Sequence, residues 1–451
     1  MKISVLGCGL RTPLLLHGLI HADLGIAHIA LYDNDSAQSR LMAQLGAELA
    51  AGATVRIEAV AAVEETIKDS AFVISSIRVG NMETRAADER IALECGFAGQ
   101  ETTGPAGFAM ALRTIPVALE YARIVLQVAP EAWIVNFTNP AGIVTQAISS
   151  QTKAKVVGIC DTPAELFHQI ARALGEPPEN VRCDYFGLNH LGWVRSVRVR
   201  GSDVTDKLLE EGHLLRRLYP ADLFDPAFIR TLRLIPTEYL FFYYNHLRAR
   251  DNQLRAGVTR GEELNILNRQ VLERLQSGIE AGDPTGTLDA YKRYLNRRNA
   301  SYMRLDGEAQ SAFAVADPDW DPFLGATGYH RIAVEAIRGL TNVRSGSMVL
   351  NVPNRGSIEG LHPEDIVEVP CTVDRSGALP LACGPPPDSV KGLLMSVKHF
   401  ERMTIEAAVR QRWDLAAFAL SLNPIVASWE ASRRFLERLA EADRGCFSNF
   451  T

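Results

Sequence analysis

The sequence predicts an α/β protein in which a parallel sheet with helices on both faces precedes an α+β region. The first observation is that short apolar segments of strand character recur at 2–6, 26–32, 54–60, 71–77, 132–136 and 155–159. The second is that helical patterns lie between most of them, as at Ser36–Ala50, Phe108–Val128 and Ile143–Gln151. This alternation is typical of a parallel sheet, and ligands of such sheets bind at the carboxyl ends of the strands.

The first segment runs directly into Gly7-Cys8-Gly9-Leu10-Arg11-Thr12-Pro13, and a helical pattern follows. Strand, glycine turn and helix are the first half of a dinucleotide-binding unit, in which a helix N-terminus faces the pyrophosphate. Arg11 and Thr12 stand where a third glycine is usual. Asp33 ends the second segment, where an acid accepts hydrogen bonds from a ribose. The alternative is an ordinary turn with Asp33 as a helix cap. We expect a Rossmann-type domain that binds NAD through Gly7, Gly9, Leu10, Arg11, Asp33 and Ser76.

Composition excludes several classes of protein. The chain has 451 residues, 47% of them hydrophobic and 22% charged, which is ordinary for two or three globular domains. A net charge of −6 without a basic block argues against a nucleic-acid partner. There is no apolar run of membrane-spanning length and no signal-peptide pattern at the start. Seven scattered cysteines do not suggest a disulfide framework, so we expect a cytoplasmic protein.

The rest of the chain predicts a second domain. Residues 183–199 read as two strands bent at Gly187–Gly192, and we place the boundary here, between residues 1–193 and 194–451. Beyond it we expect helices over most of 205–310, strands at Met348–Val352 and Asp365–Val373, and helices from Pro387 to Glu441. Two stretches are expected as loops: Gly80–Gly107, which is polar and rich in glycine, and 312–330.

Three kinds of side chain are candidates for chemistry. Cys160 and His190 each follow a predicted strand, and a thiolate with an imidazole suits a transition-metal ion; both residue types are also common as ordinary buried side chains. Tyr239 lies in an aromatic cluster, which is typical of core packing. Alternatively, a nearby metal could lower the pKa of its phenol, which could then act as a base. Asp161 precedes Thr162-Pro163, and either Asp161 or Thr162 has the additional option of capping a helix. Five arginines offer a fork for a phosphate or carboxylate: Arg78, Arg85, Arg260, Arg297 and Arg298.

Several stretches together resemble a known family. They are Arg78–Gly80, Gly99–Pro105, Ala111–Pro116, Asn136–Gly142, Gly158–Asp161, Gly187–His190, Thr259–Glu263, Asn351–Gly356 and Val367–Pro370. In this order, and over nearly the whole chain, they resemble glycoside hydrolase family 4, the NAD- and divalent-metal-dependent 6-phosphoglycosidases and their relatives, which do not use the common pair of carboxylates.

The resemblance implies hydrolysis by redox-assisted elimination. NAD oxidises the hydroxyl at sugar carbon 3, a base removes the acidified hydrogen at carbon 2, the aglycone leaves, water adds, and the hydride returns. It implies Cys160 and His190 as ligands of Mn²⁺ or another divalent metal, Tyr239 as the base with Tyr243 as second choice, and Asp161 as a candidate acid. The implied substrate contacts are Arg85, Glu101 and Asn139 for the sugar and Arg260 for a 6-phosphate.

Departures from the family pattern leave the substrate open. Asp161 is typical of 6-phospho-α-glucosidases, whereas Gly187–Trp193 and Asn351–Pro370 are more similar to 6-phospho-β-glucosidases, which we favour. The α-type, and an unphosphorylated glycoside, are the alternatives, because Asn296–Tyr302 departs from the usual form and Leu305–His330 is an insertion. The other classes to weigh are an NAD-dependent dehydrogenase, since lactate and malate dehydrogenases share the predicted first domain, and a non-enzymatic NAD sensor. The resemblance also implies a homodimer or homotetramer.

Overall fold

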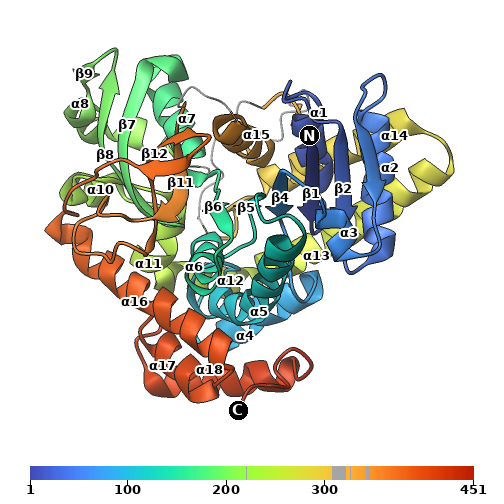
Figure 1. The fold of residues 1–451 in the computed structure, drawn as a ribbon. Coiled ribbons are helices and arrows are strands. Elements are labelled where there is room, and N and C mark those ends of the chain that lie inside the picture. The colour runs from blue at the N-terminus through green and yellow to red at the C-terminus, as the bar shows by residue number, and fades with distance from the viewer. Residues whose placement is uncertain (220, 307–320, 326, 342–345) are drawn as a thin grey trace.

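A mixed sheet runs through the molecule (Figure 1). The computed structural model describes residues 1–219, 221–306, 321–325, 327–341 and 346–451. Within them the sheet has nine strands in the order β13-β12-β11-β6-β5-β4-β1-β2-β3. The six strands of the N-terminal half are parallel, as expected: β1 (Lys2–Leu6), β2 (His28–Tyr32), β3 (Arg56–Ala59), β4 (Phe72–Ser75), β5 (Trp133–Asn136) and β6 (Lys155–Gly158).

Helices cover both faces of these parallel strands, which is why the central strands β4 and β5 are mostly apolar rather than alternating, whereas the edge strand β3 carries Arg56 and Glu58. On β1, Ile3 and Val5 face one core, and Leu6 faces another. The first core is closed by α1 (Thr12–Ile20), α2 (Ser36–Leu49) and α7 (Thr162–Leu174), the second by α3 (Val63–Ile67), α5 (Gly104–Val128) and α6 (Ala141–Gln151). The expected fold class is thereby confirmed.

The segment Gly80–Gly107 is not the long polar loop that we expected. Met82–Glu94 forms a helix, α4, which Asn81 caps by accepting a hydrogen bond from the Thr84 N–H at 3.0 Å. The prediction was wrong because the polar residues of α4 are buried in ion pairs, so the helix lacks the apolar stripe by which a helix is usually recognised. Only the stretch between α4 and α5 is a loop.

The C-terminal half adds a second, smaller sheet. A hairpin of β7 (Val181–Leu188) and β8 (Leu191–Val199) pairs with β9 (Ser202–Asp203) and β10 (Ile235–Pro236). The C-terminal half also extends the first sheet by three strands, β11 (Gly346–Pro353), β12 (Ile366–Asp374) and β13 (Gly377–Pro380). Asn351 of β11 pairs with Gly158 of β6 and so joins these strands to the parallel ones. The division at residue 193 remains a prediction; residue 193 itself lies within the hairpin.

Most helices of the C-terminal half lie in the expected ranges 205–310 and Pro387–Glu441, but the helix Tyr329–Thr341 was not expected, and its first two residues belong to the stretch expected as a loop. The helices of this half are η1 (Pro178–Asn180), α8 (Thr205–Glu210), α9 (Gly212–Leu215), α10 (Pro226–Leu232), η2 (Glu238–Leu240), α11 (Phe241–Tyr244), α12 (His246–Ala256), α13 (Arg260–Glu280), α14 (Pro284–Ala300), α15 (Tyr329–Thr341), α16 (Asp388–Arg410), α17 (Trp413–Ser421) and α18 (Trp429–Ala442). Of the loop expected at 312–330, residues 312–320 and 326 lie outside the described residues.

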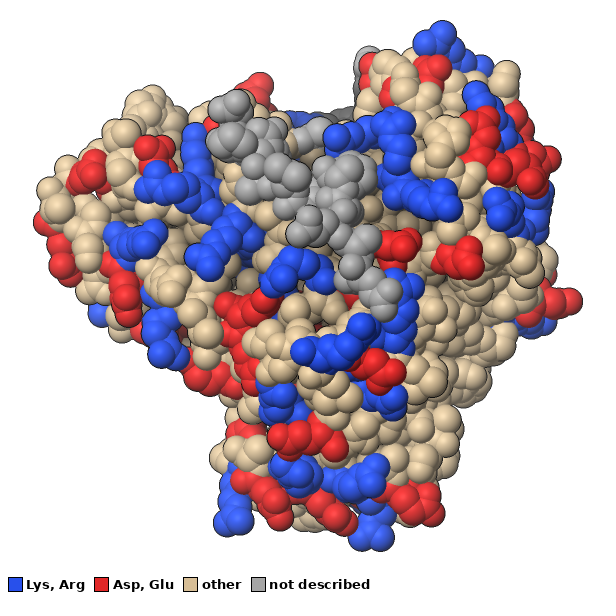
Figure 2. All heavy atoms as spheres, turned by 180° about the vertical axis from the view of Figure 1, so that it is seen from behind, with Lys and Arg blue, Asp and Glu red and all other residues tan. Residues whose placement is uncertain are grey.

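Lys and Arg lie interspersed with Asp and Glu on the face seen in Figure 2. Among the residues with described structure, no helix combines the length and apolar character needed to cross a bilayer.

Candidate active site

The turn after β1 can form only with glycine at its first position. Gly7 has φ +89°, and a Cβ there would lie 2.4 Å from the carbonyl oxygen of Ser76, at the end of β4. A Cβ on Gly9 would meet nothing within 4 Å, so the space above this glycine is open. The turn therefore packs tightly against the neighbouring strand end on one side and leaves room for a ligand on the other.

Asp33 holds this turn rather than the helix that follows. Its carboxylate accepts hydrogen bonds from the N–H groups of Cys8 at 2.7 Å and Asp35 at 2.9 Å. The cap of α2 is Asp35, which accepts from Ala37 and Gln38. The alternative reading of Asp33 as a helix cap is thus wrong, and its carboxylate stands at the end of β2, beside the glycine turn.

Leu10 and Arg11 tie the turn to the C-terminal half. Leu10 is buried, and its carbonyl accepts a hydrogen bond from the Tyr291 hydroxyl at 2.7 Å. The Arg11 guanidinium lies 3.9 Å from the centre of the Tyr329 ring, and Phe137, from the end of β5, packs edge-on against that ring at 3.9 Å. Residues from three distant parts of the chain therefore meet beside the turn.

The segment after β5 presents Asn139. Asn136 donates to the Thr138 carbonyl at 3.3 Å and to the Thr145 hydroxyl at 3.0 Å, and the Thr138 hydroxyl lies 2.9 Å from that of Ser75 on β4. These buried bonds fix the path of the chain, and Asn139 follows them, half-buried, before a cis peptide bond to Pro140.

Two acidic side chains, those of Cys160 and Asp161, follow the end of β6. Burial, and then the charges of Glu368 and Asp161, raise the pKa of the Cys160 thiol well above its ordinary value. Burial also raises the pKa of Asp161, which the Arg11 guanidinium opposes. Asp161 occupies the N-cap position of α7, but its side chain makes no capping bond. The expected cap is therefore absent, and the Asp161 carboxyl remains available for chemistry.

His190 stands in the turn between β7 and β8, with φ +60°. Its Nδ1 lies 2.9 Å from the Thr102 hydroxyl, and burial lowers its pKa to about 4, although Glu101 opposes this. The imidazole is consequently neutral near pH 7, with Nδ1 engaged and Nε2 as the remaining ligand atom. The Asn189 side chain is fixed by donating to Glu368 at 3.1 Å.

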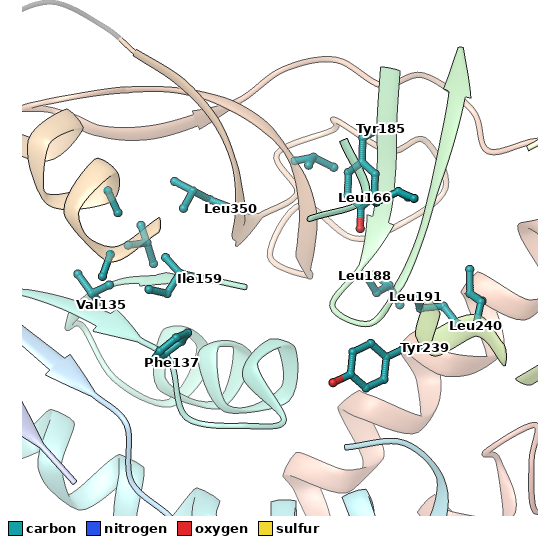
Figure 3. Packing of buried hydrophobic residues seen from close by; sticks show 14 of the residues in the cluster. Val135, Phe137, Ile159, Leu166, Tyr185, Leu188, Leu191, Tyr239, Leu240 and Leu350 are labelled. Atoms are coloured by element: carbon teal, nitrogen blue, oxygen red, sulfur yellow. The ribbon is translucent and has the colours of Figure 1, made fainter. Parts of the chain in front are cut away.

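Tyr239 lies against His190. The two rings are stacked with centres 3.8 Å apart and planes 6° from parallel. Figure 3 shows the Tyr239 hydroxyl pointing away from Leu240, toward the side on which Phe137 lies. Burial raises the pKa of this phenol well above its ordinary value, and the neighbouring Tyr329, Glu238 and Glu101 add to the rise.

Arginines and carboxylates form a buried network beside these residues. Arg85 contacts Glu101 at 2.8 Å and Glu89 at 2.8 Å, and Arg78 contacts Glu101 at 2.6 Å. Burial alone would raise the pKa of Glu101, but Arg85 and Arg78 outweigh it and hold that pKa well below its usual range. A small cavity adjoins the network, and its lining includes Arg85, Glu101 and Arg113.

Two further arginines lie together at the start of α13 and the end of α14. Arg260 donates to the Arg298 carbonyl at 2.8 Å and to the Ser301 hydroxyl at 2.5 Å. Burial and the charge of Arg298 lower the pKa of Arg260, and Arg298 also acts on Glu101 and Asp161. Arg297, on the same helix, is exposed and joins none of these contacts.

Several of the predicted residues lie around Tyr329, because Cys160, Asp161, Arg11 and Glu101 all act on its pKa. Asp33 lies apart from these residues, at the end of β2. Sequence reasoning did not anticipate the supporting residues Thr102, Glu368, Tyr302 and Tyr329, which the chain brings in from distant segments. Among the described residues, no three His, Cys, Asp or Glu side chains group as a metal site, so a cation held by Cys160 and His190 needs further ligands.

Comparison with known proteins identifies the family. The family model described as "Family 4 glycosyl hydrolase" matches residues 2–176. A second model, for the C-terminal domain of the same family, matches residues 185–426. The chain belongs to the family 4 glycosyl hydrolases. The resemblance seen in the sequence is thus confirmed, as is the expectation of a glycosidase.

Relatives of this family 4 enzyme span its full length. A probable 6-phospho-beta-glucosidase of Bacillus subtilis is 30% identical over all of this chain and 98% of its own. The structure of the Thermotoga maritima 6-phospho-beta glucosidase, with manganese, NAD+ and glucose-6-phosphate, is similar at a TM-score of 0.81 and 28% identity, covering 98% of both chains. A 6-phospho-alpha-glucosidase from gut microorganisms, with NAD and glucose-6-phosphate, follows at 0.79 and 26%, covering 100% of this chain and 99% of its own.

Proposed function

We propose that this enzyme is a 6-phospho-β-glucosidase that uses NAD and a divalent metal, preferably manganese. The observation that carries the proposal is that Tyr239 is stacked on the neutral imidazole of His190, while Cys160, Asp161 and Tyr239 are all neighbours of Tyr329, beside an open glycine turn. The structure of the Thermotoga maritima relative, which holds manganese, NAD+ and glucose-6-phosphate, supports it.

The glycine turn fits NAD. The open space above Gly9 suits a pyrophosphate, which the N-terminus of α1 would favour electrostatically. The Asp33 carboxylate stands where ribose hydroxyls are bound in such domains. We assign Gly7, Gly9, Leu10, Arg11, Asp33 and Ser76 to this site.

Cys160 and His190 fit a divalent cation that the substrate completes. Nδ1 of His190 is engaged by Thr102, which orients Nε2, and a bound cation would lower the pKa that burial raises at Cys160. When bound, the metal supplies positive charge at the oxygens of sugar carbons 2 and 3, and NAD supplies the hydride acceptor and donor.

The remaining roles follow from position. Tyr239 lies on His190 and is assigned as the base for the hydrogen at carbon 2; Asp161, whose pKa is raised by burial, is assigned as the acid for the leaving oxygen. Arg85, Glu101 and Asn139 are assigned to the sugar hydroxyls. Arg260 is assigned to the 6-phosphate, because a second cation, Arg298, lies beside it and an anion would relieve their repulsion.

The test is release of nitrophenol from the 6-phosphorylated and plain nitrophenyl glucosides, in both anomers, with NAD and manganese supplied or removed. We expect turnover of the β-linked 6-phosphate only with both present, deuterium from D₂O at carbon 2 of the product, and no net NADH. Faster turnover of the α-linked substrate would assign the α-type activity instead. Accumulating NADH would indicate a dehydrogenase, and undiminished release without NAD and metal would contradict the proposal.

Two further expectations stay proposals. All seven cysteines are free thiols, which supports a reducing, cytoplasmic location. A homodimer or homotetramer is expected from the family resemblance, and light scattering would measure it.

A further inference from the structure

Three neutral side chains converge on one buried carboxyl group, that of Glu368 on β12. Its Oε1 accepts hydrogen bonds from the amide groups of Asn351 at 3.0 Å and Asn189 at 3.1 Å. Its Oε2 accepts a hydrogen bond from the Tyr185 hydroxyl at 2.7 Å. Only 1% of Glu368 is exposed. The carboxyl group is therefore a junction between β12, β11 and the hairpin of β7 and β8, and both of its oxygens are engaged.

One of these hydrogen bonds leads to His190. Asn189 precedes His190 in the turn between β7 and β8, and its side chain is held at both ends. Nδ2 donates to Glu368, and Oδ1 accepts from the Gly142 N–H at 3.3 Å. His190 has φ +60°, a conformation that is uncommon outside glycine and persists only where the surroundings hold it. Glu368 therefore helps to hold the turn that carries the imidazole.

A second hydrogen bond leads to the end of β6. Asn351 of β11 lies directly opposite Glu368 of β12 on one side and Gly158 of β6 on the other, and directly opposite residues share a face of the sheet. A Cβ at Gly158 would lie 2.7 Å from the Cβ of Asn351, so the two strands approach more closely than any other residue would allow. Gly158 is two residues before Cys160. The side chain that Glu368 fixes is thus packed against the strand end that carries the thiol.

We propose that Glu368 is a positioning residue for the metal site, because one of its oxygens ties the segment of His190 to the segment of Cys160. Residues that orient the ligands of a metal contribute strongly to its affinity. The effect should be large in this protein, because a cation with only two protein ligands depends closely on how far apart those two are held. The inference rests on the proposed role of Cys160 and His190 as ligands.

The test measures manganese binding apart from turnover, by titrating the full-length protein with Mn²⁺ and following the electron paramagnetic resonance signal of the free ion. Glu368→Leu removes all three hydrogen bonds, so Kd for Mn²⁺ should rise about 10- to 100-fold, the range for losing a residue that orients ligands. Glu368→Gln keeps an oxygen for the two asparagines, and its amide can donate to the Tyr185 hydroxyl, so Kd should stay within about threefold. The affinity for NAD, whose assigned turn follows β1, should not change in either variant.

The matched control is Asp306→Leu, which removes another buried carboxyl group, bonded to the Gln253 amide at 3.0 Å, and should leave Kd for Mn²⁺ unchanged. The inference is overturned if Glu368→Leu binds Mn²⁺ as the wild type does while Cys160→Ser does not, or if Asp306→Leu weakens binding equally. It is also overturned if Glu368→Gln loses as much as Glu368→Leu, because charge rather than hydrogen bonding would then matter. Undiminished binding by Cys160→Ser would instead refute the assigned ligands. Should Glu368→Leu not fold, Asn189→Ala decides: it removes the link to the His190 turn and should raise Kd about tenfold.

Discussion

The imidazole of His190 and the phenol of Tyr239 lie face to face, 3.8 Å apart, although 48 residues separate them in the chain. The pairing of β10 with β8 explains the contact. Pro236, just before η2, is opposite Trp193, just after the turn that holds His190. Backbone pairing in the smaller sheet therefore brings the proposed metal ligand and the proposed base together before any ligand binds.

Removing the Tyr239 hydroxyl should abolish turnover without unfolding the protein. In Tyr239→Phe the ring still stacks on His190, but the proton acceptor is lost, and loss of a general base typically costs about 10²- to 10⁴-fold in kcat. Tyr243→Phe, our second choice for the base, is the matched control and should stay active. Steady-state kinetics, with circular dichroism to check the fold, measures both; the reverse result would move the base to Tyr243.

The two glycines of the first turn should respond differently to alanine. Gly9→Ala should fold normally, because a Cβ there contacts nothing in the protein, yet it should weaken NAD binding by filling the space assigned to the pyrophosphate. Gly7→Ala should lower the melting temperature, because φ is +89° and the new Cβ would collide with Ser76. Calorimetric NAD titration and thermal unfolding separate the effects. Unchanged NAD affinity in a folded Gly9→Ala protein would argue against the assigned site.

Stability should depend on pH through Glu101. Its pKa in the folded protein lies below that of the unfolded chain, so its contribution is present above about pH 4.5 and is lost as the pH falls. Glu101→Gln leaves Arg78 and Arg85 without their shared carboxylate and should cost about 3–5 kcal/mol at pH 7. Urea unfolding of both proteins should show a constant difference from pH 7 to about pH 4.5 and a shrinking one below it; a difference that stays constant down to the lowest pH at which both proteins still fold would contradict the argument.

Manganese affinity should depend on Cys160 and not on a cysteine elsewhere in the chain. Cys160→Ser replaces a thiolate ligand by a weak one, so both manganese binding and turnover should fall, and chelation should inactivate the wild type reversibly. Cys183→Ser, a partly exposed thiol on β7, is the control and should behave as wild type. Metal content after dialysis reports binding independently of activity, and equal content in the two variants would exclude Cys160 as a ligand.

The 6-phosphate should be recognised by Arg260. In Arg260→Gln, KM for the phosphorylated substrate should rise about 10- to 100-fold, the range for losing a charge-assisted hydrogen bond, whereas weak turnover of the plain glycoside should not change. Arg269→Gln, an exposed arginine of the same helix α13 that contacts Glu83 at 3.5 Å, is the control. Equal losses on both substrates would mean that Arg260 supports the fold rather than the phosphate.

The sequence predicted the strand ends well because local patterns determine them. Apolar segments that end in Gly7, Asp33 and Cys160 are short, regular and bounded by turn residues, so their positions can be read without knowing the tertiary structure. The family motifs then predicted which side chains meet at those ends.

What the sequence did not predict depends on contacts between distant segments. Helix α4 is held by buried ion pairs with α5 and with the loop that connects α4 to α5, so its own residues carry no helical stripe. Glu238 reads as one acid in an aromatic cluster until Tyr302 and Thr162 are brought against it. No local pattern distinguishes such a carboxyl group from a solvated one.

The continuity of the main sheet has a consequence for how the protein is made. β6 has β5 on one side, and on the other side it waits for Asn351 in β11, which is synthesised almost two hundred residues later. Until then, a strand edge next to Cys160 is without its partner, and such edges are prone to pair with other chains. The edge of β6 beside Cys160 is therefore completed only after residue 351 has been synthesised, so until then it is a place at which the growing chain is prone to aggregate.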